Sequence, residues 1–142
     1  MGFLGTKAGP FADLTLIISI ASFIILCLSI VYAKRKILSR HFRMARIAML
    51  LLIIAFTWMA FRFIGGFYSI VSRLTALPSL AVLSHVVIGA PALILGIFLA
   101  FDRMINKTRY PMRTVFLLWI LALFLGIGVY IVRYILMTFP PR

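Results

Sequence analysis

The chain has 142 residues, of which 65% are hydrophobic and only 12% are charged. A soluble domain has about 45–50% apolar and about 25% charged residues, so this composition excludes an ordinary soluble enzyme and predicts one all-α domain that spans a membrane. The net charge of +13 arises from 15 Lys and Arg against two acids. Because the basic residues flank apolar runs rather than form a groove, we expect contact with anionic phospholipids and no nucleic-acid binding.

Four apolar runs are each close to the ~20 residues that a bilayer requires. They predict transmembrane helices over about residues 12–32, 44–64, 80–101 and 114–137. Helices joined by short connections pack against their neighbours in alternating directions. The sequence therefore predicts a polytopic membrane protein that forms an antiparallel bundle of four transmembrane helices.

The first span carries a stripe of small hydroxyl residues at helical spacing. Such residues let helices approach closely and form hydrogen bonds across the contact. We predict that this stripe faces the other helices: Thr15, Ser19, Ser22 and Ser29.

A dense basic segment follows the first span and fixes the predicted orientation. Short loops rich in Lys and Arg remain in the cytoplasm. A second basic loop lies between the third and fourth spans and holds Arg103, Lys107, Arg109 and Arg113. The two basic loops together predict a plasma-membrane protein with these loops in the cytoplasm and both termini outside. We expect the following residues to contact lipid head groups or a partner: Lys34, Arg35, Lys36, Arg40, His41, Arg43 and Arg46.

The second and third spans also show one mostly small or polar stripe each, which we predict to be their packed faces. In the second span the stripe is His41, Ala45, Ala48, Leu52, Ala55, Met59 and Arg62. In the third it is His85, Gly89, Ala92, Gly96 and Ala100, with a kink expected at Pro91. In the fourth span, one face is shared by Trp119, Gly126, Tyr130 and Arg133. Residues 65–79 are predicted to be a loop with room for a short interfacial helix.

His85 is the main candidate for a functional site, because an ionisable residue inside a span is a functional hypothesis by default. Met59 is expected at a similar depth, and His with Met is a possible axial pair for haem or a soft copper site. The structural alternative is that His85 donates a hydrogen bond to a neighbouring carbonyl or to a hydroxyl of the first span. Arg62 and Arg133 are expected near the outer surface, where they either reach the interface or pair with Asp13.

Several motifs together resemble a known family. These are Arg40-His41-Phe42-Arg43-Met44-Ala45, Ser84-His85-Val86-Val87, and Trp119 followed by Gly126-Ile127-Gly128-Val129-Tyr130. They resemble the domain-of-unknown-function family 420, small four-helix membrane proteins that include a bacterial cytochrome c oxidase assembly factor. The resemblance implies a link to the biogenesis of haem–copper oxidases or to a respiratory membrane complex.

The sequence has no nucleophile–base pair, no Gly-rich phosphate loop and no Cys–Cys metal motif. The lack of catalytic groups, the small-residue faces and the resemblance together predict a non-catalytic accessory subunit or assembly factor. The larger redox complex would be a haem–copper oxidase or a membrane copper monooxygenase. Other membrane subunits would be its partners. The alternative is a haem- or copper-binding electron-transfer subunit that uses His85. A transporter or channel is disfavoured, because the spans hold no acid beyond Asp13 at the edge of the first.

Overall fold

The computed structural model describes residues 2–73, 76–101 and 109–136, and it shows only helices and turns there. The helices are α1 (Pro10–Lys34), α2 (Leu38–Val71), α3 (Leu77–Ala100) and α4 (Arg109–Ile131), which continues as the π-helical turn η1 (Val132–Leu136). Four helical stretches in the described part are long and apolar enough to cross a membrane: Pro10–Lys34, Leu38–Tyr68, Leu77–Ala100 and Tyr110–Leu136. The prediction of four helices of transmembrane length is confirmed.

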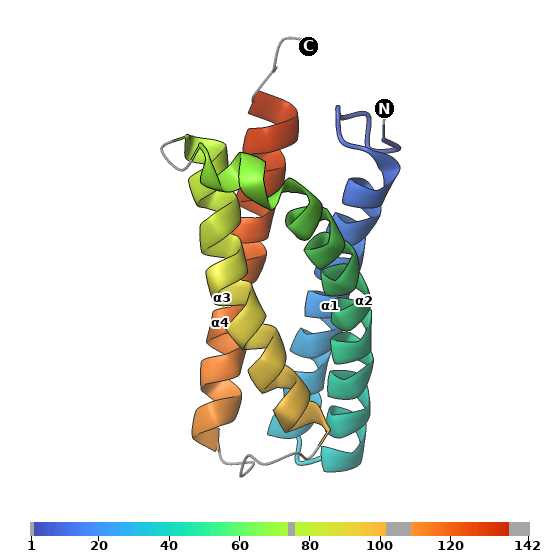
Figure 1. Ribbon diagram of the computed structural model, residues 1–142. Coiled ribbons are helices and arrows are strands. Elements are labelled where there is room, and N and C mark those ends of the chain that lie inside the picture. The colour runs from blue at the N-terminus through green and yellow to red at the C-terminus, as the bar shows by residue number, and fades with distance from the viewer. Residues whose placement is uncertain (1, 74–75, 102–108, 137–142) are drawn as a thin grey trace.

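α2 is longer than predicted at both ends. It begins at Leu38, so the basic residues from Arg40 onward lie on its first turns rather than in a loop. It also continues through Gly65 and Gly66 to Val71, so the loop predicted from residue 65 was wrong there. A glycine costs only about 1 kcal/mol in a helix, and the apolar residues that follow keep the helical spacing. Figure 1 shows the last turns of α2 bending across the molecule toward the start of α3, and glycine pairs are common sites of such bends.

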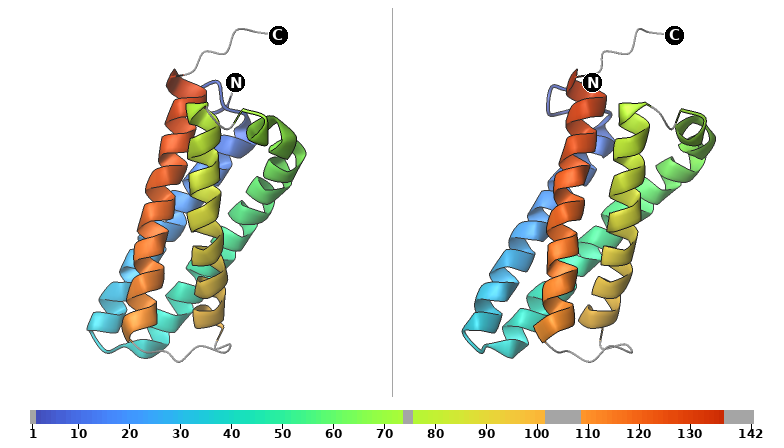
Figure 2. Two further views of the ribbon diagram at one scale, coloured as in Figure 1. Left: turned by 60° about the vertical axis from the view of Figure 1, so that its left-hand side comes forward. Right: turned by 90° about the vertical axis from the view of Figure 1, so that its left-hand side faces the viewer.

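The four helices are arranged as two closely packed pairs, α1 with α2 and α3 with α4 (Figures 1 and 2). We call the end where α1 begins and η1 lies the upper end, as in Figure 1, and the opposite end the lower end. In the first pair, the buried Ser22 hydroxyl donates to the Ala48 carbonyl at 2.6 Å and the Ser29 hydroxyl donates to the His41 carbonyl at 3.0 Å. The stripe was predicted to face the other helices, and its lower half, Ser22 and Ser29, contacts α2. Thr15 and Ser19 of the upper half donate to carbonyls of α1 itself.

The second pair is joined by two nitrogen-bearing rings that reach backbone carbonyls. The Trp119 indole N–H of α4 donates to the Ala92 carbonyl of α3 at 3.3 Å, and the His85 ring of α3 lies 2.9 Å from the Ala122 carbonyl of α4. Pro91 lies inside α3, and Figure 1 shows the helix changing direction near its middle. Each ring therefore adds a bond between α3 and α4 at a backbone carbonyl.

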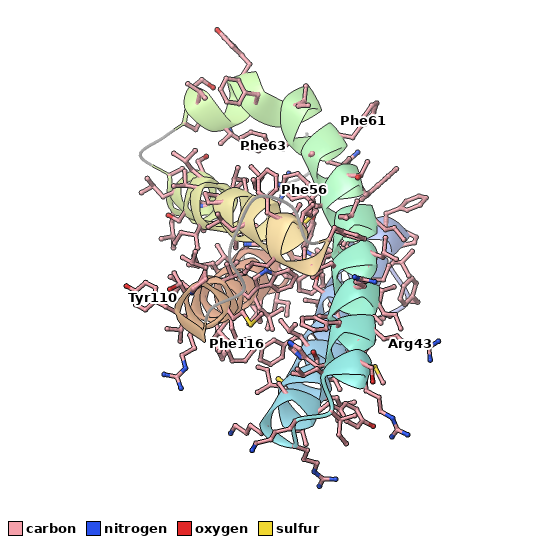
Figure 3. All side chains as sticks on the ribbon, turned by 90° about the horizontal axis from the view of Figure 1, so that it is seen from below. Arg43, Phe56, Phe61, Phe63, Tyr110 and Phe116 are labelled. Carbon is pink, nitrogen blue, oxygen red and sulfur yellow. The ribbon has the colours of Figure 1, made fainter. Side chains whose placement is uncertain are left out.

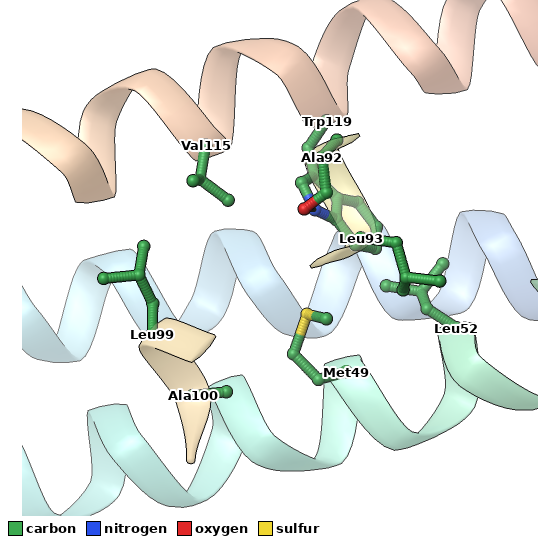
Figure 4. Close-up of a cluster of buried hydrophobic side chains, with 8 residues drawn as sticks. All are labelled: Met49, Leu52, Ala92, Leu93, Leu99, Ala100, Val115 and Trp119. Carbon is green, nitrogen blue, oxygen red and sulfur yellow. Dashed lines mark hydrogen bonds between the residues drawn. The ribbon is translucent and has the colours of Figure 1, made fainter. Parts of the chain in front are cut away.

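The apolar core lies between α2, α3 and α4, in the middle and lower parts of the molecule. Figure 4 shows its members: Met49, Leu52, Ala92, Leu93, Leu99, Ala100, Val115 and Trp119. Gly96 allows this close packing, because an added Cβ would lie 3.0 Å from both Sδ and Cε of Met49 and 3.4 Å from Nε1 of Trp119. The predicted small-residue face of α3 is thus the face that packs.

Hydrogen bonds tie the two pairs together at both ends. At the lower end, Nε of Arg46 on α2 donates to the Ala100 carbonyl at the end of α3 at 3.0 Å. At the upper end, Tyr130 of α4 bonds to Asp13 of α1 and to Thr6 of the segment that precedes α1. Between the core and the upper ties, the pairs enclose a cavity.

Candidate functional site

The cavity has a volume of about 500 Å³ and is lined by residues from all four helices. This volume falls within the range of about 300–1,000 Å³ that is typical of small-molecule sites. Leu52 and Trp119 of the core form part of its lining, and exposed Phe11 and Trp58 lie at its rim, where their rings stack at 4.3 Å. The cavity therefore extends from the core to the surface near the upper end.

The lining is mostly apolar, and its charged or imidazole side chains are Arg62, His85 and Arg133. Figure 3 shows two sides of α2: Phe56 lies on the side that faces the other helices, and Phe61 projects away from the molecule. Trp119, Gly126, Tyr130 and Arg133, which share a face in the sequence, all line the cavity; Trp119 and Tyr130 are buried, whereas Arg133 on η1 is exposed. Residues of the faces predicted to pack on α1, α2 and α3 line it as well.

His85 forms a hydrogen bond that fixes the roles of its two ring nitrogens. Nδ1 lies 2.9 Å from the Ala122 carbonyl oxygen, and because a carbonyl can only accept, Nδ1 carries the proton and donates. Nε2 of the neutral ring is then an acceptor, and among the described residues it has no hydrogen-bond partner. The predicted alternative, a hydrogen bond to a neighbouring carbonyl, is confirmed, and it leaves Nε2 available in a half-buried residue that lines the cavity.

Gly126 gives the His85 ring its place against α4. A Cβ added at this glycine would lie 2.9 Å from Cε1 and 3.3 Å from Nδ1 of His85. Real Cβ atoms do not approach a ring that closely, so any larger residue would push the imidazole away from the Ala122 carbonyl. The sequence placed Gly126 on the packed face, but spacing alone did not identify the histidine as the group that packs on it.

Met59 lines the same cavity as His85 and is half-buried. The prediction that the two residues lie in one region is supported, whereas their joint binding of an iron or copper ion stays a prediction. Within the described residues, no three His, Cys, Asp or Glu side chains come together to hold a metal ion.

Asp13 is fully buried and has partners other than those predicted. Its Oδ1 accepts the Tyr130 hydroxyl at 2.5 Å, and its Oδ2 accepts the Leu4 backbone N–H at 2.9 Å. Since the Tyr130 proton goes to Asp13, the Thr6 hydroxyl donates to the Tyr130 oxygen at 2.7 Å. The predicted pairing of Asp13 with Arg62 or Arg133 was wrong, because the segment before α1 folds over the carboxylate and supplies a donor.

Arg62 and Arg133 are exposed residues that line the cavity, one on α2 and one on η1. The guanidinium of Arg133 lies 5.8 Å from the centre of the Tyr134 ring, which is a cation–π contact. Neither arginine forms an ion pair with any residue in the described part of the chain. They therefore place two uncompensated positive charges beside an apolar cavity.

The predicted head-group contacts lie at the lower end and fall into two groups. Lys34, Arg35, Lys36, Arg40 and Arg43 are exposed, although the Arg40 guanidinium also lies 5.7 Å from the centre of the Tyr32 ring. Figure 3 shows Arg43 pointing outward. His41 and Arg46 have partners inside the protein, because Nδ1 of His41 lies 2.7 Å from the Ser29 hydroxyl and Arg46 donates to Ala100. Lipid contact by any of these residues stays a prediction. Residues 103 and 107 of the second basic loop lie outside the described residues.

No family model, no curated protein and no solved structure matches the chain. The resemblance to family 420 therefore stays a prediction that depends on the short motifs around His41, His85 and Trp119.

Proposed function

We propose that the chain is a non-catalytic integral membrane accessory protein, an assembly factor or subunit of a larger redox complex such as a haem–copper oxidase or a membrane copper monooxygenase. The observation that supports this most is the cavity, which is suited to hold a ligand rather than to transform one. Its hydroxyls Thr15 and Ser19 donate to carbonyls of their own helix, at 2.7 and 2.8 Å. Among the described residues, no base therefore activates them.

The same proposal includes an antiparallel bundle in the plasma membrane, with the lower end in the cytoplasm and both termini outside. The exposed lysines and arginines of residues 34–43 support this orientation, because they resist translocation. Large apolar side chains on the outer faces, such as Val87, Leu117 and Phe124, suit contact with lipid or with helices of partner subunits.

A native gel tests the accessory role. Membranes of the source organism, solubilised in a mild detergent, should show the tagged chain in a high-mass band together with haem-staining oxidase subunits or with the copper monooxygenase. Deletion of the gene that encodes the chain should reduce the amount of that assembled complex. Migration only as the free chain, with the amount of complex unchanged in the deletion strain, would contradict the proposal.

A second candidate function is a haem-binding electron-transfer subunit, and the geometry of His85 favours it. A histidine that binds a metal usually donates its other ring N–H to a carbonyl or carboxylate, which fixes the tautomer. His85 has this arrangement, with Nε2 left for a ligand. Haem fits the site better than a bare copper ion, because a copper ion would need more protein donors than His85 and Met59 offer. His85, and Met59 of the same cavity, would hold the haem, which would supply one-electron chemistry.

An absorption titration tests this candidate. Detergent-purified protein mixed with haem should develop a Soret band that saturates at one haem per chain, and His85→Ala should abolish it. His41→Ala is the matched control, since its ring bonds to Ser29 far from the cavity, and it should keep the band. Size-exclusion chromatography would show that both variants remain folded. No band in the wild type, or an equal band in His85→Ala, would contradict haem binding, and copper analysis of the same samples tests the copper alternative.

A further inference from the structure

We propose that the upper cavity is a site for an anionic phospholipid, with one acyl chain in the cavity and the phosphate between Arg62 and Arg133. This site is separate from the basic lower end of the molecule. It also stands independently of the accessory role, because it concerns only what fills this cavity.

The apolar walls determine the part of the ligand that enters. Side chains from both helix pairs form these walls, among them Leu16, Phe23, Phe56, Leu93, Leu123 and Ile127. An apolar group that fills this volume of about 500 Å³ would gain dispersion contacts with the side chains that line it. A bilayer supplies one abundant group that can make these contacts, the acyl chain of a lipid, and the exposed rim residues Phe11 and Trp58 leave it a path of entry.

The two arginines determine the charge of the head group. Arg62 lies near the bend of α2 and Arg133 on η1, so they approach the cavity from different helix pairs. The planar guanidinium forms paired hydrogen bonds with phosphate oxygens. Asp13, the acid near the same end of the molecule, already accepts hydrogen bonds from Leu4 and Tyr130 at its two oxygens. A phosphate would therefore supply the negative charge that the described residues do not.

Two further features at the rim agree with a lipid site. Trp58 stacks on Phe11 beside the cavity, and tryptophan is enriched at the level of lipid head groups. Arg133 lies on a π-helical turn, a rare conformation that is frequently found at functional sites. A phosphate held by both arginines would join the two helix pairs at the upper end, beside the tie through Asp13.

Lipid retention tests the site. The chain is purified from nanodiscs that contain equal amounts of phosphatidylglycerol and phosphatidylcholine, and retained lipid is measured by native mass spectrometry. The wild type should retain one phosphatidylglycerol. The double variant Arg62→Gln/Arg133→Gln should lower that retention by about 30-fold, the loss expected for two arginines at an anionic surface. Ser19→Phe, which fills the cavity and keeps the arginines, should also lose the lipid.

Matched controls separate this site from general charge effects. Lys34→Gln/Arg35→Gln removes the same charge from exposed residues at the lower end and should retain the lipid within twofold of the wild type. Arg62→Lys/Arg133→Lys keeps the charge and the fold but lacks the planar fork, so its retention should be intermediate.

Three results would overturn the lipid site. The first is equal retention of the two lipids by the wild type, and the second is unchanged retention in Arg62→Gln/Arg133→Gln. The third is another occupant, either a free fatty acid found by extraction or a haem whose Soret band is lost in His85→Ala. None of these results would alter the band on the native gel, so failure of the lipid site and failure of the accessory role can be told apart.

Discussion

Trp119→Ala should lower the free energy of unfolding by about 3 kcal/mol, the lower end of the range for removing a large buried aromatic side chain. Trp119 is 7% exposed and lies in the core between α2, α3 and α4, where its N–H donates to Ala92. The lower end of the range applies because lipid, rather than water, surrounds the helices before they pack. The loss then arises from the volume left by the indole ring and from the hydrogen bond between Trp119 and Ala92.

Circular dichroism during unfolding of the detergent-purified protein by sodium dodecyl sulfate measures this effect. Trp119→Phe should lose only about 1 kcal/mol, because it keeps a ring in the core and loses the hydrogen bond. Leu117→Ala is the matched control on the same helix, and since Leu117 is 64% exposed it should change stability by less than about 0.5 kcal/mol. Equal losses in Trp119→Ala and Leu117→Ala would mean that the core does not hold α4 in place.

The packed faces of the helices could be predicted from the sequence. Thr15, Ser22 and Ser29 are buried on α1, and Ala92, Gly96 and Ala100 are buried on α3. These predictions depend only on the helical repeat and on the tendency of small residues to lie where backbones approach. Neither the helical repeat nor the size of a residue depends on which helix is the neighbour.

The partners across helices could not be predicted. Tyr130 is separated by 117 positions from Asp13 and by 124 from Thr6, and spacing within a helix assigns a face without naming what meets it. The sequence analysis gave Arg62 or Arg133 as one alternative partner of Asp13, and neither arginine bonds to it among the described residues. The donors came from the segment before α1 and from a phenol.

The cavity could not be predicted from the sequence either, although many of its lining residues lie on the predicted faces. It forms where the two helix pairs separate, and that depends on bends in α2 and α3 rather than on any one face. The Gly65-Gly66 pair was interpreted as the start of a loop, whereas α2 bends near these residues and brings Ile70 back to the cavity. Whether glycines end a helix or bend it depends on the packing that follows them.

Asp13→Ala should lower the free energy of unfolding by about 2 kcal/mol, because it removes the acceptor of the Leu4 N–H and of the buried Tyr130 hydroxyl, and the Thr6 hydroxyl can replace it only for Tyr130. Tyr130→Phe should lose about 1 kcal/mol, since only one donor is removed and the ring still packs. Hydrogen exchange of residues 2–9 should rise in Asp13→Ala, because the carboxylate holds the Leu4 amide. Thr57→Ala is the control, because that hydroxyl is exposed and bonds only within its own helix.

A double-mutant cycle decides whether Asp13 and Tyr130 act as one tie. Residues in one hydrogen-bond network typically show coupling of about 0.5–3 kcal/mol, so Asp13→Ala/Tyr130→Phe should be less destabilised than the sum of the single variants. Additive losses would mean that the two side chains do not depend on each other. The two helix pairs would then be joined mainly by the apolar core and by the bond from Arg46 to Ala100 at the lower end.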